Sequence, residues 1–418
     1  MDKNTIKKII LENQSRISSL QIVKRDYSVE AQANYIFTGQ RRVGKTYFVL
    51  SLVQDLINEG LAVEAVLHIN FEDERLIGLD ITELDEILES YQELFKHKPV
   101  LFFDEIQNIS GWQKFARRMA DSGFKIYITG SNSEMLSGEM ASTLGGRFMV
   151  MEIETLSFKE FLLFHKIEPT ENIEFSSDRF DVIRLFDSYF SEGGFPELFK
   201  YVDKKEYLSN IFQKVFLGDI ISRYQIRNPF ALKLLIKKLA ESTMDEVSYN
   251  RMRNIIVSTI VQIATTTVIE YVKYLEDSFL ISSLENYNAK ISSRESKKKY
   301  YFRDNGILSL FLIDPASFQL ETLVFNKLRT IYKANCFYLR NGYEVDFFIP
   351  GEALIQVCFS IDEPATRTRE ISALLKAKLT HPVKNMTIIT YSTEEIVTIE
   401  TSTISIVPVW KWILKAGI

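Results

Sequence analysis

Residues 39–46 read GQRRVGKT and follow the short apolar run Tyr35–Phe37 after a single residue, Thr38. In this pattern the two glycines permit a tight backbone path whose N–H groups turn inward and form an anion-binding nest, and a lysine and a threonine follow. The mechanism needs a strand before the loop and a helix after it, because the helix N-terminus adds partial positive charge. These eight residues therefore predict a parallel α/β sheet with a phosphate-binding loop.

The loop is expected to bind ATP together with Mg²⁺. Lys45 would reach the β- and γ-phosphates, and the Thr46 hydroxyl would be a ligand of Mg²⁺. Such a motif also arises by chance in chains of this length, so other residues have to agree with it. The residues predicted to contact the nucleotide are Gly39, Gln40, Arg41, Arg42, Val43, Gly44, Lys45, Thr46 and Tyr47.

Short β-rich runs alternate with amphipathic helical stretches over the first part of the chain. This alternation predicts a P-loop ATPase domain over residues 1–155, with a parallel sheet and helices on both of its faces. The predicted strands are Tyr35–Thr38, Val63–Asn70, Pro99–Asp104, Lys125–Thr129 and Phe148–Ile153, and the predicted helices are Tyr47–Glu59, Ile81–Lys96 and Trp112–Asp121.

The stretch PVLFFDEIQNI is a second candidate element of the site. A buried strand that ends in Asp104 and Glu105 places carboxylates at the carboxyl edge of the sheet, where open α/β folds bind ligands. We expect Asp104 to hold Mg²⁺ through water, and Glu105 to orient the attacking water and accept its proton. The alternative is an acidic strand end that is merely solvated.

Two later stretches add polar groups to the same edge. KIYITGSNSEML ends a strand in small polar residues, so Ser131 or Asn132 would hydrogen-bond the attacking water or the γ-phosphate. In STLGGRFMVMEI, Arg147 would present its guanidinium to phosphate charge in the transition state, in its own subunit or across a subunit interface. A plain surface arginine is the alternative.

The chain changes character after Leu156. Residues 156–228 have helical periodicity and few strand signals, which predicts a helical connector or lid. Residues 229–304 contain three helical segments followed by a β-ribbon, the pattern of a winged helix-turn-helix. Residues 305–418 alternate between strands and helices and predict a second, smaller α/β domain.

These motifs together resemble a family of bacterial and archaeal AAA-type ATPases that carry a second domain of unknown function, the AAA_14 plus DUF4143 type. The resemblance spans nearly the whole chain and implies ATP hydrolysis, a winged helix and a C-terminal fold like that of restriction endonucleases, the PD-(D/E)XK fold. Besides GQRRVGKT, it rests on LHINFEDERL, LFFDEIQNISGWQKFARRMAD, ITGSNSEMLSGEMASTLGGR, LSFKEF, GGFPE, TTTVIEYVKYLEDSFLI, YYFRDNGI, LETLVFNKL and GYEVDFFIPGEALIQV.

The C-terminal domain departs from that nuclease pattern. PD-(D/E)XK nucleases use one acid on a helix, one on a strand and a (D/E)-x-K on the next strand, because carboxylates chelate Mg²⁺ while the lysine assists water. Here Glu321 and Asp346 match the first two positions, but Gln356 replaces the third acid and Cys358 replaces the lysine. We therefore expect no nuclease activity. Glu344 and Asp346 would bind a metal or a nucleic-acid end, or simply flank an exposed strand.

Composition narrows the partners without naming one. The net charge of −5 gives no global basic signature, so DNA contact would depend on local charge such as Lys297, Lys298 and Lys299 near the predicted wing. Two outputs are open: a DNA-associated motor or switch, and a regulatory scaffold that binds protein partners or further copies of the chain. The two cysteines are too few for a disulfide framework and lack the paired spacing of a zinc site. Because the sequence also has no signal peptide and no long apolar segment, we expect a soluble, cytoplasmic protein without membrane contact.

Overall fold

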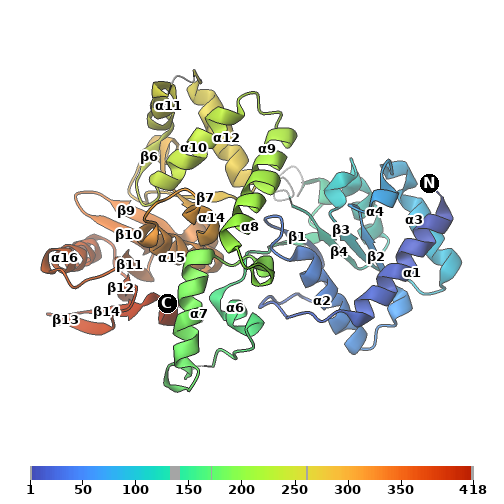
Figure 1. Ribbon diagram of the computed structural model, residues 1–418, viewed down its shortest axis with the longest axis horizontal. Helices are drawn as coiled ribbons and strands as arrows, with labels where there is room; N and C mark the ends of the chain where they lie inside the picture. The colour runs from blue at the N-terminus through green and yellow to red at the C-terminus, as the bar shows by residue number, and fades with distance from the viewer. Residues whose placement is uncertain (1, 132–141, 171, 260–261, 416–418) are drawn as a thin grey trace. The chain divides into compact units, whose positions relative to one another are not determined.

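The computed structural model describes residues 2–131, 142–170, 172–259 and 262–415. The chain divides into two compact units, Met1–Thr155 and Leu156–Ile418 (Figure 1). Each unit is described by itself.

The first unit is built on a five-stranded parallel sheet with the strand order β2-β3-β4-β1-β5. This confirms the predicted P-loop ATPase fold class. The strands are β1 (Asn34–Thr38), β2 (Val66–Asn70), β3 (Val100–Asp104), β4 (Ile126–Thr129) and β5 (Phe148–Glu152), and the helices are α1 (Lys3–Ser19), α2 (Lys45–Asn58), α3 (Leu84–Leu94) and α4 (Trp112–Asp121).

Helices cover both faces of this sheet because its strands are apolar on both sides. Phe37 of β1 stacks on Tyr127 of β4, and Phe48 of α2 meets Phe37 edge-on with ring centroids 5.0 Å apart. Ile36, between Tyr35 and Phe37, points to the opposite face and joins the core formed with α3 and α4. Helix α1 packs against α3 and β2.

The strand register brings the carboxyl ends of the central strands to one edge. Asn70 pairs with Asp104, and Phe37 pairs with Thr129. The P-loop follows Thr38 at this same edge. Residues that are far apart in the sequence therefore meet where ligands bind in open parallel sheets.

The second unit contains two further sheets. The strands are β6 (Val247–Ser248), β7 (Ile281–Leu284), β8 (Lys297–Phe302), β9 (Phe337–Arg340), β10 (Glu344–Ile349), β11 (Ala353–Val357), β12 (Asn385–Thr390), β13 (Glu395–Ile399) and β14 (Ser402–Pro408). The helices are α6 (Phe158–Phe164), α7 (Arg179–Glu192), α8 (Lys204–Asn210), α9 (Gly218–Arg223), α10 (Pro229–Glu241), α11 (Tyr249–Ser258), α12 (Thr265–Asp277), α13 (Ile291–Ser296), α14 (Asn305–Ser309), α15 (Ala316–Tyr332), α16 (Pro364–Thr380) and α17 (Val409–Leu414).

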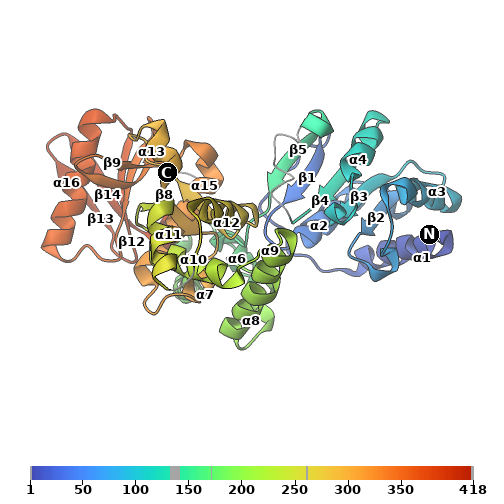
Figure 2. The ribbon, with the colours of Figure 1, turned by 90° about the horizontal axis from the view of Figure 1, so that it is seen from above.

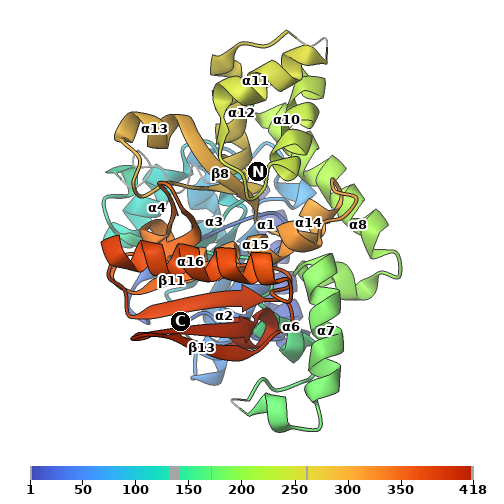
Figure 3. The ribbon, with the colours of Figure 1, turned by 90° about the vertical axis from the view of Figure 1, so that its left-hand side faces the viewer.

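The larger of these sheets is mixed, with the order β13-β14-β12-β11-β10-β9, and has a core on each face. Helix α16 lies across one face (Figure 3). On the other face, α15 and α17 share a core with α6 and α7. The segments predicted as a connector and as a C-terminal domain therefore pack around one apolar core, because aromatic residues of α6 and α7 bury against the sheet's helices.

A smaller antiparallel sheet, with the order β6-β8-β7, lies beside helices α10, α11 and α12 (Figures 1 and 2). The three helices correspond to the predicted helical segments ALKLLIKKLAES, VSYNRMRNIIVS and TTTVIEYVKYLEDS, and each begins within two residues of the start of its segment. The predicted ribbon corresponds to β7 and β8, and α13 lies between them.

Some elements of the second unit are absent from the sequence prediction. Strand β13 is an edge strand whose side chains are mostly exposed, so its sequence lacks a clear apolar face. The run ISIVPVW (residues 404–410) predicts a strand, but strand β14 ends at Pro408 and helix α17 begins at Val409. No helix in the described part of the chain is long and apolar enough to cross a membrane.

Candidate functional site

The P-loop runs from the end of β1 to the start of α2, and its glycines meet real steric demands. Gly39 has a φ of +143°, and a β-carbon there would lie 2.2 Å from the carbonyl oxygen of Ile153. Gly44, the residue before α2, has a φ of +94°. Both positions need a residue without a side chain.

Lys45 is the most buried cation of the loop, with 4 % of its surface exposed. Its ammonium group donates hydrogen bonds to the carbonyl oxygens of Gly39 (3.1 Å) and Gln40 (2.8 Å) and lies 3.7 Å from Glu105 Oε1. Burial lowers the pKa of Lys45, while the carboxylates of Glu105 and Asp104 act in the opposite direction. The lysine therefore lies between the loop backbone and the two predicted acids.

Asp104 and Thr46 meet directly. The Thr46 hydroxyl donates a 2.7 Å hydrogen bond to Asp104 Oδ2, and the Thr129 hydroxyl bonds the other carboxylate oxygen. Burial raises the pKa of Asp104 to about 6, even though both hydroxyl contacts favour its charged form. A hydroxyl and a carboxylate side by side are the oxygen ligands that Mg²⁺ prefers.

Glu105 adopts the left-handed backbone conformation, with a φ of +53°, which is uncommon for a residue with a side chain. The Thr129 hydroxyl accepts a 3.0 Å hydrogen bond from the Glu105 N–H. The amide of Gln107 donates to Glu105 Oε2 and also lies 3.3 Å from the Ser131 hydroxyl. Strained backbone of this kind gathers at functional sites.

Gln107 is the residue that sequence reasoning missed. Its amide connects Glu105 with Ser131, which comes from the end of the neighbouring strand β4. The only sequence signal is its place two residues after Glu105 in DEIQ. Asn132, predicted beside Ser131, lies outside the described residues.

The remaining predicted loop residues differ in exposure. Gln40 is 4 % exposed, Val43 is fully buried, and Tyr47 is 45 % exposed. Arg41 lies 3.9 Å from Glu72 in the loop after β2. Arg42 has a φ of +65°, so its backbone shares the left-handed turn of the loop.

Arg147 is not placed with these groups. It directly precedes β5, whose first residue Phe148 pairs with Asn34 at the amino end of β1, whereas the P-loop follows the carboxyl end at Thr38. A strand of this length separates its first and last residues by about 13 Å. Its guanidinium contacts Asp121 and the carbonyl oxygen of Gly145 instead.

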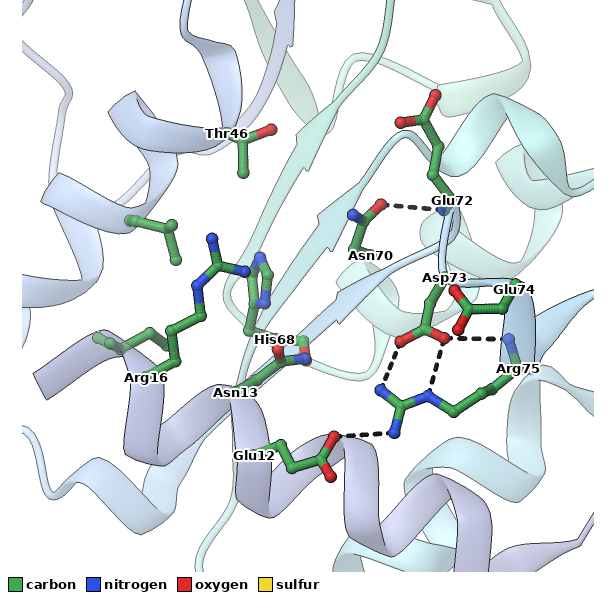
Figure 4. Close-up of a pocket in the computed structure, with 12 residues that line it drawn as sticks. Glu12, Asn13, Arg16, Thr46, His68, Asn70, Glu72, Asp73, Glu74 and Arg75 are labelled. Atoms are coloured by element: carbon green, nitrogen blue, oxygen red, sulfur yellow. Dashed lines mark hydrogen bonds and ion pairs between the residues drawn. The ribbon is translucent and has the colours of Figure 1, made fainter. Parts of the chain in front are cut away.

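A polar cavity of about 380 Å³ adjoins the site at Thr46 (Figure 4). It lies between α1, the start of α2, the end of β2 and residues 72–75, with Arg16 and His68 pointing into it. Burial lowers the pKa of His68 to about 4, so its ring is neutral at pH 7, and neither ring nitrogen has a hydrogen-bond partner among the described residues. The cavity has room for about ten water molecules beside Thr46.

The three lysines predicted as local positive charge near the wing are only partly available to a partner. They lie on β8, where Lys298 pairs with Glu285 at 2.9 Å and Lys299 is only 1 % exposed. Of the three, Lys297 alone is exposed to solvent. The prediction that this run as a whole offers phosphate contacts is therefore not supported by its burial.

Two family models match the chain. One, described as an AAA domain, matches residues 32–162, and the other, a domain of unknown function (DUF8612), matches residues 183–316. The DUF4143 assignment from the sequence corresponds to neither model and stays a prediction.

Two relatives cover most of the chain. The uncharacterized protein MJ1544 of Methanocaldococcus jannaschii is 35 % identical over 432 residues, which cover 99 % of this chain and 96 % of that protein. An uncharacterized protein of Haemophilus influenzae is 30 % identical over 364 residues, covering 82 % and 86 %.

The similar solved structures have low TM-scores. The Walker-type ATPase PABY2304 of Pyrococcus abyssi has a TM-score of 0.40 at 15 % identity, with 74 % of this chain and 95 % of that chain covered. The Aeropyrum pernix Orc1 protein, in a complex with DNA, has a TM-score of 0.33 at 11 % identity, with 73 % and 89 % covered.

Proposed function

This chain belongs to the family of the Methanocaldococcus jannaschii protein MJ1544, with an AAA domain in its first unit, and we propose that it is a Mg²⁺-dependent ATPase. It converts ATP to ADP and phosphate and works as a nucleotide-driven switch or motor.

The convergence of four side chains carries this proposal. Lys45, Thr46, Asp104 and Glu105 come from two separate stretches, yet Thr46 bonds Asp104 at 2.7 Å and Lys45 lies 3.7 Å from Glu105. A cation for phosphate, two oxygen ligands for a metal and a base for water thus share one edge of the sheet. Phosphoryl transfer needs these groups because its catalysis is mainly positioning and charge stabilisation.

Each side chain of the site would have its own role in hydrolysis. Lys45 leaves the carbonyl oxygens of Gly39 and Gln40 and binds the β- and γ-phosphates. Thr46 and Asp104 would hold Mg²⁺, which would supply positive charge to neutralise the phosphates. Glu105 then orients a water molecule and accepts its proton, with its carboxylate positioned by Gln107, whose amide also donates to the Ser131 hydroxyl.

Binding and hydrolysis can be tested separately. Binding of a non-hydrolysable ATP analogue, measured by calorimetry, should be lost in Lys45→Ala. Phosphate release should be lost in Glu105→Gln while the variant still binds ATP. Equal phosphate release from the wild type and Glu105→Gln would show that Glu105 is not the base.

We further propose that residues 229–304 form a winged helix and residues 305–418 a restriction-endonuclease-like domain without nuclease activity, with residues 156–228 as a helical connector. The order β6-β8-β7 beside three helices supports the first assignment. The helix acid Glu321 and the strand acid Asp346 support the second.

The output of the ATPase has two candidates, a DNA-associated switch and a protein-binding scaffold. The charges of the wing favour the scaffold. Lys298 is paired with Glu285, Lys299 is buried, and α12 carries Glu270, Glu276 and Asp277 against a single lysine, Lys273. On strand β8, a duplex would therefore meet Lys297 as the one exposed lysine of the run Lys297–Lys299.

DNA binding as a function of salt distinguishes the two outputs. Fluorescence anisotropy with a labelled duplex at about 50 and 200 mM salt should show weak or no binding for a scaffold, since phosphate contacts weaken steeply with salt. DNA-stimulated phosphate release would instead favour the DNA-associated switch.

A further inference from the structure

A buried lysine lies among three carboxylates in the second unit. Lys299 of β8 is 1 % exposed, and its ammonium nitrogen lies 3.0 Å from Glu344 Oε1, 3.7 Å from Glu321 Oε1 and 3.8 Å from Asp346 Oδ1. We call Glu321, Glu344 and Asp346 the C-terminal acidic cluster. The cluster combines a helix residue from α15 with two strand residues from β10, and the cation comes from a third element.

Hydrogen bonds hold two of the carboxylates in fixed positions around the lysine. The Tyr301 hydroxyl donates to Glu321 Oε1 at 2.6 Å, and the backbone N–H of Val357 donates to Asp346 Oδ2 at 2.8 Å. The Lys299 ammonium group also lies over the ring of Tyr338, 5.3 Å from its centroid. The lysine is thus enclosed by acidic and aromatic groups and does not reach the surface.

Gln356, where the nuclease pattern has its third acid, has a different role. Its side-chain oxygen accepts a 2.9 Å hydrogen bond from the Asp346 N–H, and its amide nitrogen donates to the Glu344 carbonyl at 3.0 Å. Both ends of the amide therefore bind the backbone of β10. Gln356 fixes the strand that carries two of the acids and contributes no ligand.

The charges of the cluster explain why a cation is present. Burial alone favours neutral Lys299, but the carboxylates of Glu321, Asp346 and Glu344 outweigh it and raise the pKa of the lysine. Burial also raises the pKa values of Glu321 and Asp346, while the charge of Lys299 acts against that rise. Buried carboxylates need a partner cation, and the chain supplies one.

We propose that the Lys299 ammonium group is the resident cation of the C-terminal acidic cluster, in the position that a divalent metal ion would take, so that this domain binds no Mg²⁺ or Mn²⁺. With Lys299 between its carboxylates, the cluster is not a metal site, and no group of three or more His, Cys, Asp or Glu side chains among the described residues is arranged to hold a metal. The same lysine fastens β8 to α15 and β10, which joins the three-helix part to the C-terminal sheet.

Mn²⁺ binding by the full chain tests this inference. A parent variant with Thr46→Val and Asp104→Asn removes the metal ligands of the ATPase site, and free Mn²⁺ is measured by electron paramagnetic resonance without nucleotide. The parent should bind no Mn²⁺. Adding Lys299→Met should create a single Mn²⁺ site per chain, which a further Asp346→Asn removes, and the exposed Lys297→Met is the matched control.

Three outcomes would overturn the proposal. The first is Mn²⁺ binding by the parent that is lost on Asp346→Asn, because the cluster would then hold a metal beside Lys299. The second is a folded Lys299→Met variant that binds no Mn²⁺. The third is metal-dependent DNA cleavage by the wild type that Lys299→Met abolishes.

If Lys299→Met does not fold, Lys299→Arg keeps a cation in the cluster. In the parent background this variant should bind no Mn²⁺, and binding that depends on Asp346 would contradict the proposal.

Discussion

The Thr46 hydroxyl donates a 2.7 Å hydrogen bond to Asp104, a residue 58 positions later in the chain. The bond joins the first residues of α2 to the end of β3 and aligns the two oxygen ligands proposed for Mg²⁺.

Thr46→Val keeps the shape of the side chain but removes its oxygen. We expect Mg²⁺ to stop strengthening nucleotide binding in this variant, with a loss of about 10- to 100-fold in affinity for the metal complex. Calorimetry with a non-hydrolysable analogue, with and without EDTA, measures the effect. Thr46→Ser keeps the hydroxyl and should bind the metal complex as the wild type does. An equal loss of affinity in Thr46→Ser would show that the effect comes from altered packing and not from the missing oxygen.

In the nucleotide-free protein, the buried Asp104 makes the free energy of unfolding depend on pH. Its pKa is about 6 in the fold and 3.8 in an exposed chain. The folded state therefore binds the proton more tightly, and stability falls as pH rises from about 4 to 6, by about 3 kcal/mol in total. Asp104→Asn should remove this fall.

The measurement is urea unfolding of both proteins between about pH 4.5 and 8. The stability of Asp104→Asn relative to wild type should increase as pH rises to about 6 and then level off. A constant difference across the range would show that Asp104 has an ordinary pKa.

Gln107 is expected to act as a positioning residue for Glu105. Gln107→Leu should lower kcat by about 10-fold or more, because a misplaced base loses proton transfer, and leave ATP-analogue binding unchanged. Gln107→Glu puts a second carboxylate beside Glu105 and should move the acidic limb of the kcat profile to higher pH. The neighbouring Asn108→Ala, which loses only a bond to the Phe71 carbonyl, is the control.

Arg147 lies at the opposite end of β1 from its own P-loop, so a role in hydrolysis requires a neighbouring copy. Arg147→Ala and Glu105→Gln should each be inactive alone. A mixture of the two should regain phosphate release, because Arg147 of a Glu105→Gln subunit can then act at the intact Glu105 of an Arg147→Ala subunit. Arg117→Ala, which loses a nearby contact to Asp121, is the control. Normal phosphate release by Arg147→Ala would instead show that Arg147 is a surface residue without a role in hydrolysis.

Much of the first unit could be predicted because its signals are local. GQRRVGKT fixes strand, loop and helix in order, and the apolar run before Asp104 and Glu105 predicts a strand end at the same edge. Helix α4 spans the predicted Trp112–Asp121, and the five strands lie within their predicted runs to a few residues. Apolar periodicity specifies which face of an element is buried, so these features depend only on nearby residues.

Tertiary structure decided what joins distant segments. The sequence alone determined a P-loop sheet with Lys45, Thr46, Asp104 and Glu105 at one edge. Only the fold showed that Gln107 bonds Glu105, that Arg147 lies at the far end of its strand, and that Lys299 is buried against Glu344. The reason is physical: a lysine-rich run has the same composition whether water solvates its charges or carboxylates from distant elements pair with them, and the tertiary packing of β8 against α15 and β10 decides which.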